Sequence, residues 1–339
     1  MSGRRSNQGS TPTGELDRAP LLGPEDVAAA AAVLDGVAVR TPLTDLADGF
    51  AVKREDLQPV GAFKVRGAFH AASRLAPERQ AAGLVTHSSG NHGRALAWVA
   101  RRLGVPCTVV APDDAVETKV AAMAELGARL VRVPADERES AADAVVAETG
   151  GTLIPPYDHP HVIAGQGTVG AEILADRPDV EQVVVPIGGG GLISGIAAAL
   201  RGSGVRVVGA EPELAGDAAA SRRAGERVRF PREQVAATAA DGLRATVLGE
   251  LTWPHVRDLV ADVVTIDEEA IADATRRLHA AGVACEASGA VATAGWLALP
   301  PADRTRRTVA VVSGGNVDPA WLARVLADQH ERSPVPTFG

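Results

Sequence analysis

Gly61-Ala62-Phe63-Lys64-Val65-Arg66-Gly67 is a short stretch that places one lysine among small and apolar neighbours. Loss of water around an amine disfavours its charged form and makes it a better nucleophile. Taken alone, such a lysine is more often a solvated residue at the start of a helix. The rest of the chain favours a desolvated, nucleophilic lysine, because glycine-rich loops recur beyond this stretch at wide spacing.

Three such loops follow: Ser-Ser-Gly-Asn-His from Ser88 to His92, four glycines from Gly188 to Gly191, and Ser-Gly-Gly-Asn from Ser313 to Asn316. Glycine lets the backbone approach an oxyanion closely, and the N-terminus of a following helix attracts negative charge. Together with an amine that can form a Schiff base, these loops suit a small, anionic, carbonyl-bearing cofactor. The four glycines lack the acid of a dinucleotide fingerprint and the Gly-Lys-Ser/Thr of a nucleotide P-loop.

Short apolar strands alternate with alanine-rich helices along most of the chain. We expect strands near 84–86, 108–110, 129–133, 183–187, 205–210 and 309–312. The helices that follow them are expected near 91–103, 117–126, 137–147, 192–200, 215–224 and 319–327. Nearly continuous apolar strands in repeated strand–helix units predict an α/β fold with parallel sheets covered by helices.

The same pattern suggests how the chain is divided. Residues 1–20 are rich in Gly, Ser, Thr, Arg and Pro and are predicted to form a disordered tail. We expect a small domain at 81–159, inserted into a larger domain made of 21–80 and 160–330. A cleft between two α/β domains is a usual place for a small-molecule site.

The composition excludes several classes of function. The chain has 339 residues, a formal charge of -8 and 3% aromatic residues, which does not suit a nucleic-acid binder. No apolar run approaches the length of a membrane span, and nothing near the N-terminus resembles a secretory signal. The two cysteines, Cys107 and Cys285, have no metal or redox spacing. We therefore expect a cytoplasmic enzyme that binds neither nucleic acid nor membrane.

The lysine stretch also resembles a known motif. Lys53-Arg54-Glu55-Asp56, followed by Gln58 to Ala68, is similar to the active-site lysine motif of fold-type II pyridoxal-phosphate enzymes, in particular the serine/threonine dehydratase and serine racemase group. The resemblance extends over almost all of residues 40–328. It implies a two-domain fold like that of the tryptophan synthase β subunit, with pyridoxal 5'-phosphate attached to Lys64. We also expect a homodimer.

The resemblance assigns cofactor contacts to particular residues. Phe63 and Lys64 would lie at the cofactor, and Gly188, Gly189, Gly190 and Gly191 would bind its phosphate. Asn91 would bond the phenolic oxygen of the ring, and Ser313 the pyridine nitrogen. Glu286 is expected near that ring, although Ala287 stands where the family usually has proline.

The loop from Ser88 to His92 is implied to hold the substrate carboxylate through Ser88, Ser89, Asn91 and His92. Ser89 is the most diagnostic of these residues, because many threonine dehydratases have alanine there. In racemases the serine hydroxyl exchanges a proton on the cofactor face opposite the lysine. The alternative is that Ser89 is only a small residue in a turn, and that the loop is an ordinary helix cap.

A possible metal site lies just beyond the strand at 205–210. Glu211 and Asp217 flank Ala215, and two carboxylates with a backbone carbonyl can hold a hard cation with water completing the shell. Acidic residues in a surface turn are the simpler interpretation. The stretch resembles the divalent-metal site of serine racemases, which implies Mg²⁺, or else Ca²⁺ or Mn²⁺.

These expectations converge on an ammonia-lyase that converts L-threonine or L-serine to a 2-keto acid and ammonia, with racemisation as a possible side activity. Two alternatives share the cofactor: a dedicated serine racemase and a threo-3-hydroxyaspartate dehydratase. The second is kept open by Ala62, since many threonine dehydratases have serine there. A more remote alternative is a non-catalytic metabolite-binding protein built on Gly188 to Gly191.

Overall fold

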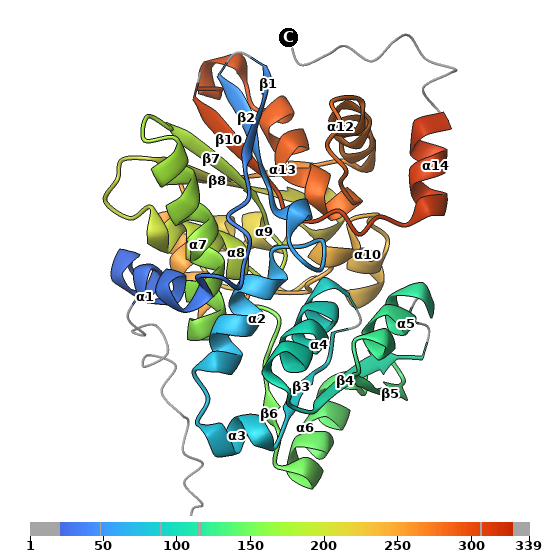
Figure 1. Ribbon diagram of the computed structural model, residues 1–339. Helices are drawn as coiled ribbons and strands as arrows, with labels where there is room; N and C mark the ends of the chain where they lie inside the picture. The colour runs from blue at the N-terminus through green and yellow to red at the C-terminus, as the bar shows by residue number, and fades with distance from the viewer. Residues whose placement is uncertain are drawn as a thin grey trace, which may run out of the picture.

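The computed structural model of the protein describes residues 21–47, 49–88, 90–113, 115, 117–305 and 307–327. It contains two sheets flanked by helices. In Figure 1 the larger sheet lies in the upper half of the molecule and the smaller sheet in the lower half. The larger sheet has the order β1 (Leu43–Ala47), β2 (Phe50–Arg54), β10 (Thr308–Val312), β7 (Gln182–Pro186), β8 (Arg206–Pro212) and β9 (Asp262–Ile266). The smaller sheet has the order β5 (Arg129–Val133), β4 (Cys107–Pro112), β3 (Leu84–Thr86) and β6 (Thr152–Leu153).

The predicted α/β fold class is confirmed. The described strands pair in parallel in both sheets, apart from β1, which pairs antiparallel with β2 at one edge of the larger sheet. The strands of the smaller sheet lie between residues 84 and 153. The boundaries of an inserted domain at 81 and 159 stay a prediction, and the tail proposed for residues 1–20 lies outside the described residues.

The helices connect the strands and cover the sheets (Figure 1). The described helices are α1 (Pro24–Leu34), α2 (Lys64–Ser73), α3 (Pro77–Ala81), α4 (Asn91–Leu103), α5 (Glu117–Glu125), α6 (Arg138–Thr149), α7 (Pro160–Asp176), α8 (Gly191–Ala199), α9 (Asp217–Ala224), α10 (Arg232–Ala236), α11 (Thr252–Leu259), α12 (Glu268–Ala280), α13 (Ala287–Ala298) and α14 (Pro319–Ala327). Short 3-10 turns lie at Glu55–Leu57, Glu213–Ala215, Asp241–Leu243 and Pro301–Asp303.

The valine-rich strands of the larger sheet are buried on both faces, as parallel strands between helices must be. Val184 of β7 packs in the core cluster formed with α12 and α13. Val183 and Val185 point the other way, into the cluster formed with α7, α8 and α11. Successive side chains of a strand alternate between faces, so a continuous apolar run fills both cores at once.

Helix α2 joins the two halves of the molecule, since it packs against both α7 and α4. Its Arg66 is 1% exposed and donates to Glu55 at 2.8 Å and to Glu172 of α7 at 2.6 Å. Lys53 of β2 is fully buried and donates to the same Glu172 at 2.7 Å. This ion cluster, defined here as Lys53, Glu55, Arg66 and Glu172, fixes the first turn of α2 to the larger sheet.

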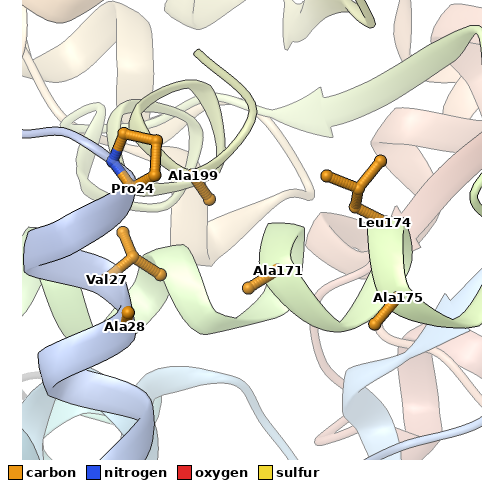
Figure 2. Close-up of a pocket in the computed structure, with 7 residues that line it drawn as sticks. All are labelled: Pro24, Val27, Ala28, Ala171, Leu174, Ala175 and Ala199. Carbon is orange, nitrogen blue, oxygen red and sulfur yellow. The ribbon is translucent and has the colours of Figure 1, made fainter. Parts of the chain in front are cut away.

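A groove of about 260 Å³ lies between α1, α7 and α8 and is lined by apolar side chains such as Val27, Leu174 and Ala199 (Figure 2). None of its lining residues is a predicted site residue. Across the described ranges, no helix is both long and apolar enough to span a bilayer.

Candidate active site

Lys64 differs from the other lysines of the chain in its partners. The sequence has three lysines, and two of them are paired with carboxylates: Lys53 with Glu172, and Lys119 with Asp241. The Nζ atom of Lys64 instead donates to the carbonyl oxygen of Pro156 at 2.8 Å. Burial lowers the pKa of Lys64 to about 8, although its side chain is still partly accessible to solvent. An amine with a lowered pKa and solvent access is suited to covalent attachment of an aldehyde.

The lysine stretch is hydrogen-bonded to the loop that follows β10. Lys64 is the first residue of α2, and the backbone N–H of Phe63 donates to the Ser313 carbonyl at 3.1 Å. Ala62 and Gly314 form a single antiparallel bridge beside it. The Phe63 ring lies beneath the amine, with Nζ 5.0 Å from the ring centroid. The structure thus places Phe63, Lys64 and Ser313 next to one another, and their contacts with the cofactor stay a prediction.

The four glycines connect β7 to α8 in a loop with no room for side chains. Gly190 has φ +90°, which strains any L side chain. A Cβ on Gly188 would lie 3.0 Å from Leu243, and one on Gly190 would lie 2.8 Å from the Thr252 hydroxyl. The loop is therefore held tightly while it leads into the N-terminus of α8, a geometry that suits a phosphate.

Asn91 begins α4 and is held by two neighbours. Its Nδ2 donates to Glu286 Oε1 at 2.6 Å, and its Oδ1 accepts from Asn316 at 2.8 Å. Burial, and then the charge of Asp241, raise the pKa of Glu286 to about 7. One hydrogen of Asn91 Nδ2 is left over from these contacts and remains able to donate to a phenolic oxygen, the bond that the sequence predicted.

The residues predicted to bind the substrate carboxylate are only partly described. Ser88 is half-buried, and its carbonyl lies so close to α4 that a Cβ on Gly93 would be 1.9 Å from it. His92 is 1% exposed, and its Nε2 is bonded to the Ile154 carbonyl at 2.9 Å. Burial lowers the pKa of His92 to about 3, so the ring is neutral and braces the loop. Ser89 lies outside the described residues.

Ser313 is almost fully buried at the carboxyl end of β10. Its hydroxyl has one long contact, 3.5 Å to the Ser288 carbonyl, which is a weak hydrogen bond. Ser288 in turn accepts the Gly242 N–H at 2.9 Å. The Ser313 hydroxyl is therefore weakly committed and is available to a ring nitrogen.

Glu211 and Asp217 are buried side by side at the end of β8. Glu211 accepts the N–H groups of Ala218 and Ala219 at the start of α9, while Oδ2 of Asp217 is buried without a partner among the described residues. Burial raises the pKa of Glu211 to about 8 and that of Asp217 to about 7. Ala215 is buried in the turn between them.

This donor set fits a hard cation, because one carboxylate oxygen is orphaned and burial of the two carboxyls outweighs the charges of Arg223 and Arg229. In the described part of the chain no group of three or more His, Cys, Asp or Glu is arranged to hold a metal ion. A cation between Glu211 and Asp217 would therefore need backbone and water oxygens as well.

Two contacts in the site were not expected from the sequence. The ring of Tyr157 lies against Gly189, and the Thr252 hydroxyl donates to the Gly189 carbonyl at 2.8 Å. Neither residue belongs to a local motif. The Pro155-Pro156 pair, which marks the chain crossing just before Tyr157, was the one signal pointing to this segment.

A family model described as pyridoxal-phosphate-dependent enzyme (PALP) matches residues 35–314. The chain belongs to this family and, within it, to the group of ammonia-lyases and serine racemases. The structure of maize serine racemase superposes with a TM-score of 0.85 at 36% identity, covering 92% of this chain and 99% of that one.

Curated relatives carry different activities. L-threonine ammonia-lyase of Thermotoga maritima is 38% identical over 314 residues, which cover 89% of this chain and 77% of the relative. L-threo-3-hydroxyaspartate ammonia-lyase of Saccharomyces cerevisiae is 38% identical over 284 residues, covering 82% and 86%. The predicted family is confirmed, and these similarities do not decide among its activities.

Proposed function

We propose that the protein is an ammonia-lyase acting on small β-hydroxy amino acids, L-threonine or L-serine, and that it racemises the substrate as a side reaction. The observation that carries the proposal is Lys64, whose amine has no carboxylate partner among its described contacts and a lowered pKa. The chain belongs to a family of pyridoxal-phosphate enzymes, and its relatives include serine racemase, L-threonine ammonia-lyase and L-threo-3-hydroxyaspartate ammonia-lyase. Membership of an enzyme family gives no support to the non-catalytic alternative.

When bound, pyridoxal phosphate supplies an electron-withdrawing ring that weakens the bonds at the substrate Cα. Lys64 Nζ would hold the cofactor and, once freed by the substrate, accept the Cα proton. Ser88 and the N-terminus of α4 would hold the substrate carboxylate. The N–H groups of Gly188 to Gly191 would hold the cofactor phosphate. Loss of the β-hydroxyl and hydrolysis then give a 2-keto acid and ammonia.

The test is a substrate panel of L- and D-serine, L-threonine and both 3-hydroxyaspartates, with keto acid and inverted amino acid measured for wild type and Ser89→Ala. We expect keto acid from L-threonine or L-serine in both proteins, and inverted product from the wild type alone, since Ser89 would reprotonate the second face. Dominant inversion in the wild type would favour a dedicated racemase, and turnover limited to hydroxyaspartate would favour the dehydratase. Equal loss of both products in Ser89→Ala would refute the two-face assignment.

We further propose that Glu211, Ala215 and Asp217 hold Mg²⁺, with Ca²⁺ or Mn²⁺ as substitutes. Support comes from the orphaned Asp217 oxygen and from the burial of the two carboxyls, which the charges of Arg223 and Arg229 do not offset.

Magnesium should raise the melting temperature of the wild type but not that of Asp217→Asn, because binding to the folded state alone stabilises it by RT ln(1 + L/Kd), where L is the free ligand concentration. At 100 times Kd the stabilisation is about 2.7 kcal/mol. Glu213→Gln is the matched control, since Glu213 is an exposed carboxylate in the same turn. An equal shift in all three proteins would show that magnesium binds elsewhere and would contradict the proposed site.

The expected homodimer is also a proposal. Light scattering coupled to gel filtration would give its mass directly.

A further inference from the structure

One five-residue segment, Ile154 to Asp158, contacts three parts of the candidate site: His92, Lys64 and the four-glycine loop. It follows β6 and leads into α7. The Ile154 carbonyl accepts from His92 at 2.9 Å, and the Pro156 carbonyl accepts from Lys64 at 2.8 Å. The Asp158 carboxylate accepts the N–H groups of Glu250 and Leu251 at 2.9 and 2.8 Å. We call Ile154 to Asp158 the crossover segment.

Tyr157 is the residue of this segment that meets the four-glycine loop. A Cβ on Gly189 would lie 2.3 Å from two atoms of the Tyr157 ring, and a Cβ on Gly191 would lie 2.9 Å from the Tyr157 Cβ. Real Cβ contacts are not that short, so the ring lies against a backbone that only glycine can provide. The first and third positions of the loop, Gly188 and Gly190, face other neighbours.

The opposite side of the loop is closed by the segment that leads into α11. Thr252 Oγ1 donates to the Gly189 carbonyl at 2.8 Å, and a Cβ on Gly190 would lie 2.9 Å from Leu248. The Asp158 carboxylate accepts the N–H groups of the residues just before Thr252. The backbone next to Tyr157 is therefore hydrogen-bonded to the start of α11. The loop is thus held between an aromatic ring on one side and a hydroxyl and a leucine on the other.

We propose that Tyr157 is a positioning residue that holds the Gly188–Gly191 loop in the conformation that binds the cofactor phosphate. Its ring acts by packing, and its hydroxyl is dispensable. Since Pro156 also accepts from Lys64, the crossover segment sets the phosphate loop and the lysine relative to each other. The inference rests on the cofactor of the family and is independent of which amino acid is turned over.

The electrostatics of the residue agree with this role. Burial, followed by the charges of Asp158, Glu139 and Asp217, raises the pKa of the Tyr157 phenol. The phenol is therefore neutral at physiological pH and does not repel a phosphate dianion held by the neighbouring N–H groups.

The first measurement is the dissociation constant of pyridoxal phosphate, obtained by equilibrium dialysis of the holoenzyme. Tyr157→Phe should stay within about threefold of the wild type, and Tyr157→Ala should bind the cofactor at least about tenfold more weakly, as expected for contacting residues. Trp98→Ala is the control for loss of a half-buried aromatic residue elsewhere, and it should leave the constant unchanged. A Tyr157→Phe variant as weak as Tyr157→Ala would assign the effect to the hydroxyl and overturn the proposal.

The second measurement is a double-mutant cycle with Gly189→Ala, with circular dichroism confirming that each variant is folded. In the wild type the added methyl meets the ring and should weaken cofactor binding strongly; with Tyr157→Ala it has space, so its effect should shrink by about tenfold. If the two substitutions changed the dissociation constant by independent factors, the Tyr157 ring would not determine the conformation of the loop, and the proposal would be overturned. Because the readout is cofactor affinity, neither result depends on the lyase activity, which can fail separately.

Discussion

Lys64→Ala should lower the turnover of any amino-acid substrate by at least about 10³-fold, because a positioned general base alone contributes about 10²–10⁴-fold and covalent attachment of the cofactor is lost as well. Cofactor can still bind through the glycine loop without the covalent link. We therefore expect the purified variant to be folded, to bind pyridoxal phosphate reversibly and to be inactive at all pH values tested.

The measurement that assigns the residue is borohydride reduction followed by mass spectrometry of peptides. The wild type should carry the reduced cofactor on the peptide that contains Lys64, and Lys64→Ala should carry none. Lys119→Arg is the matched control, since it keeps the charge that pairs with Asp241 and should keep the adduct at Lys64. With three lysines in the chain the result is unambiguous: an adduct on Lys53 or Lys119 would contradict the assignment.

The central strands were predictable from the sequence because a strand that is buried on both faces needs apolar residues at successive positions. Leu84–Thr86 (β3) was predicted to the residue, and β7 and β10 within one residue at each end. Among the edge strands, β5 was predicted as Arg129–Val133, but β1, β6 and β9 were not predicted. β1 and β9 are half-exposed and mix Thr and Asp with apolar residues, so neither a run nor a strict alternation appears. In β2 the run is broken by Lys53, whose charge is hidden in the ion cluster.

Helix α7 shows the opposite difficulty. It carries three glycines, each of which lowers helix propensity by about 1 kcal/mol relative to alanine. Their reason is tertiary: a Cβ on Gly165 would lie 2.7 Å from Gly67 of α2, and one on Gly167 would lie 2.7 Å from the Gly195 carbonyl of α8. Close packing of three helices therefore outweighs local propensity, and only the fold reveals it.

The residues of the candidate site also fall into those that the sequence indicates and those that only the fold reveals. Loops that bind through backbone N–H groups leave a glycine signature, and for that reason Gly188–Gly191 was a candidate phosphate loop from the sequence alone. Tyr157 and Thr252 both contact Gly189, although they are separated from it in the sequence by more than thirty and more than sixty residues. The local sequences around them are ordinary. Contacts of that kind depend on how the chain crosses between the sheets, which local patterns do not encode.

Arg66→Met should lower the free energy of unfolding by about 3–5 kcal/mol, since removing one partner of a buried ion pair leaves an uncompensated charge. Arg66 is the centre of the ion cluster, and without it Glu55 keeps no cation at hydrogen-bond distance among its described contacts. Urea unfolding followed by tryptophan fluorescence would measure the change. Arg132→Met is the matched control, because its pair with Glu117 is exposed and should contribute less than about 1 kcal/mol.

The pH dependence of this difference gives a second, independent readout. Burial alone would raise the pKa of Glu55, but the charge and hydrogen bonds of Arg66 hold it below its ordinary value of 4.5. A carboxyl with a lowered pKa in the folded state contributes stability above its unfolded pKa and loses it as the pH falls through the folded value. The gap between wild type and Arg66→Met should therefore narrow in acid, and a gap that stays constant from pH 7 to pH 3 would mean that Arg66 acts through packing and not through charge.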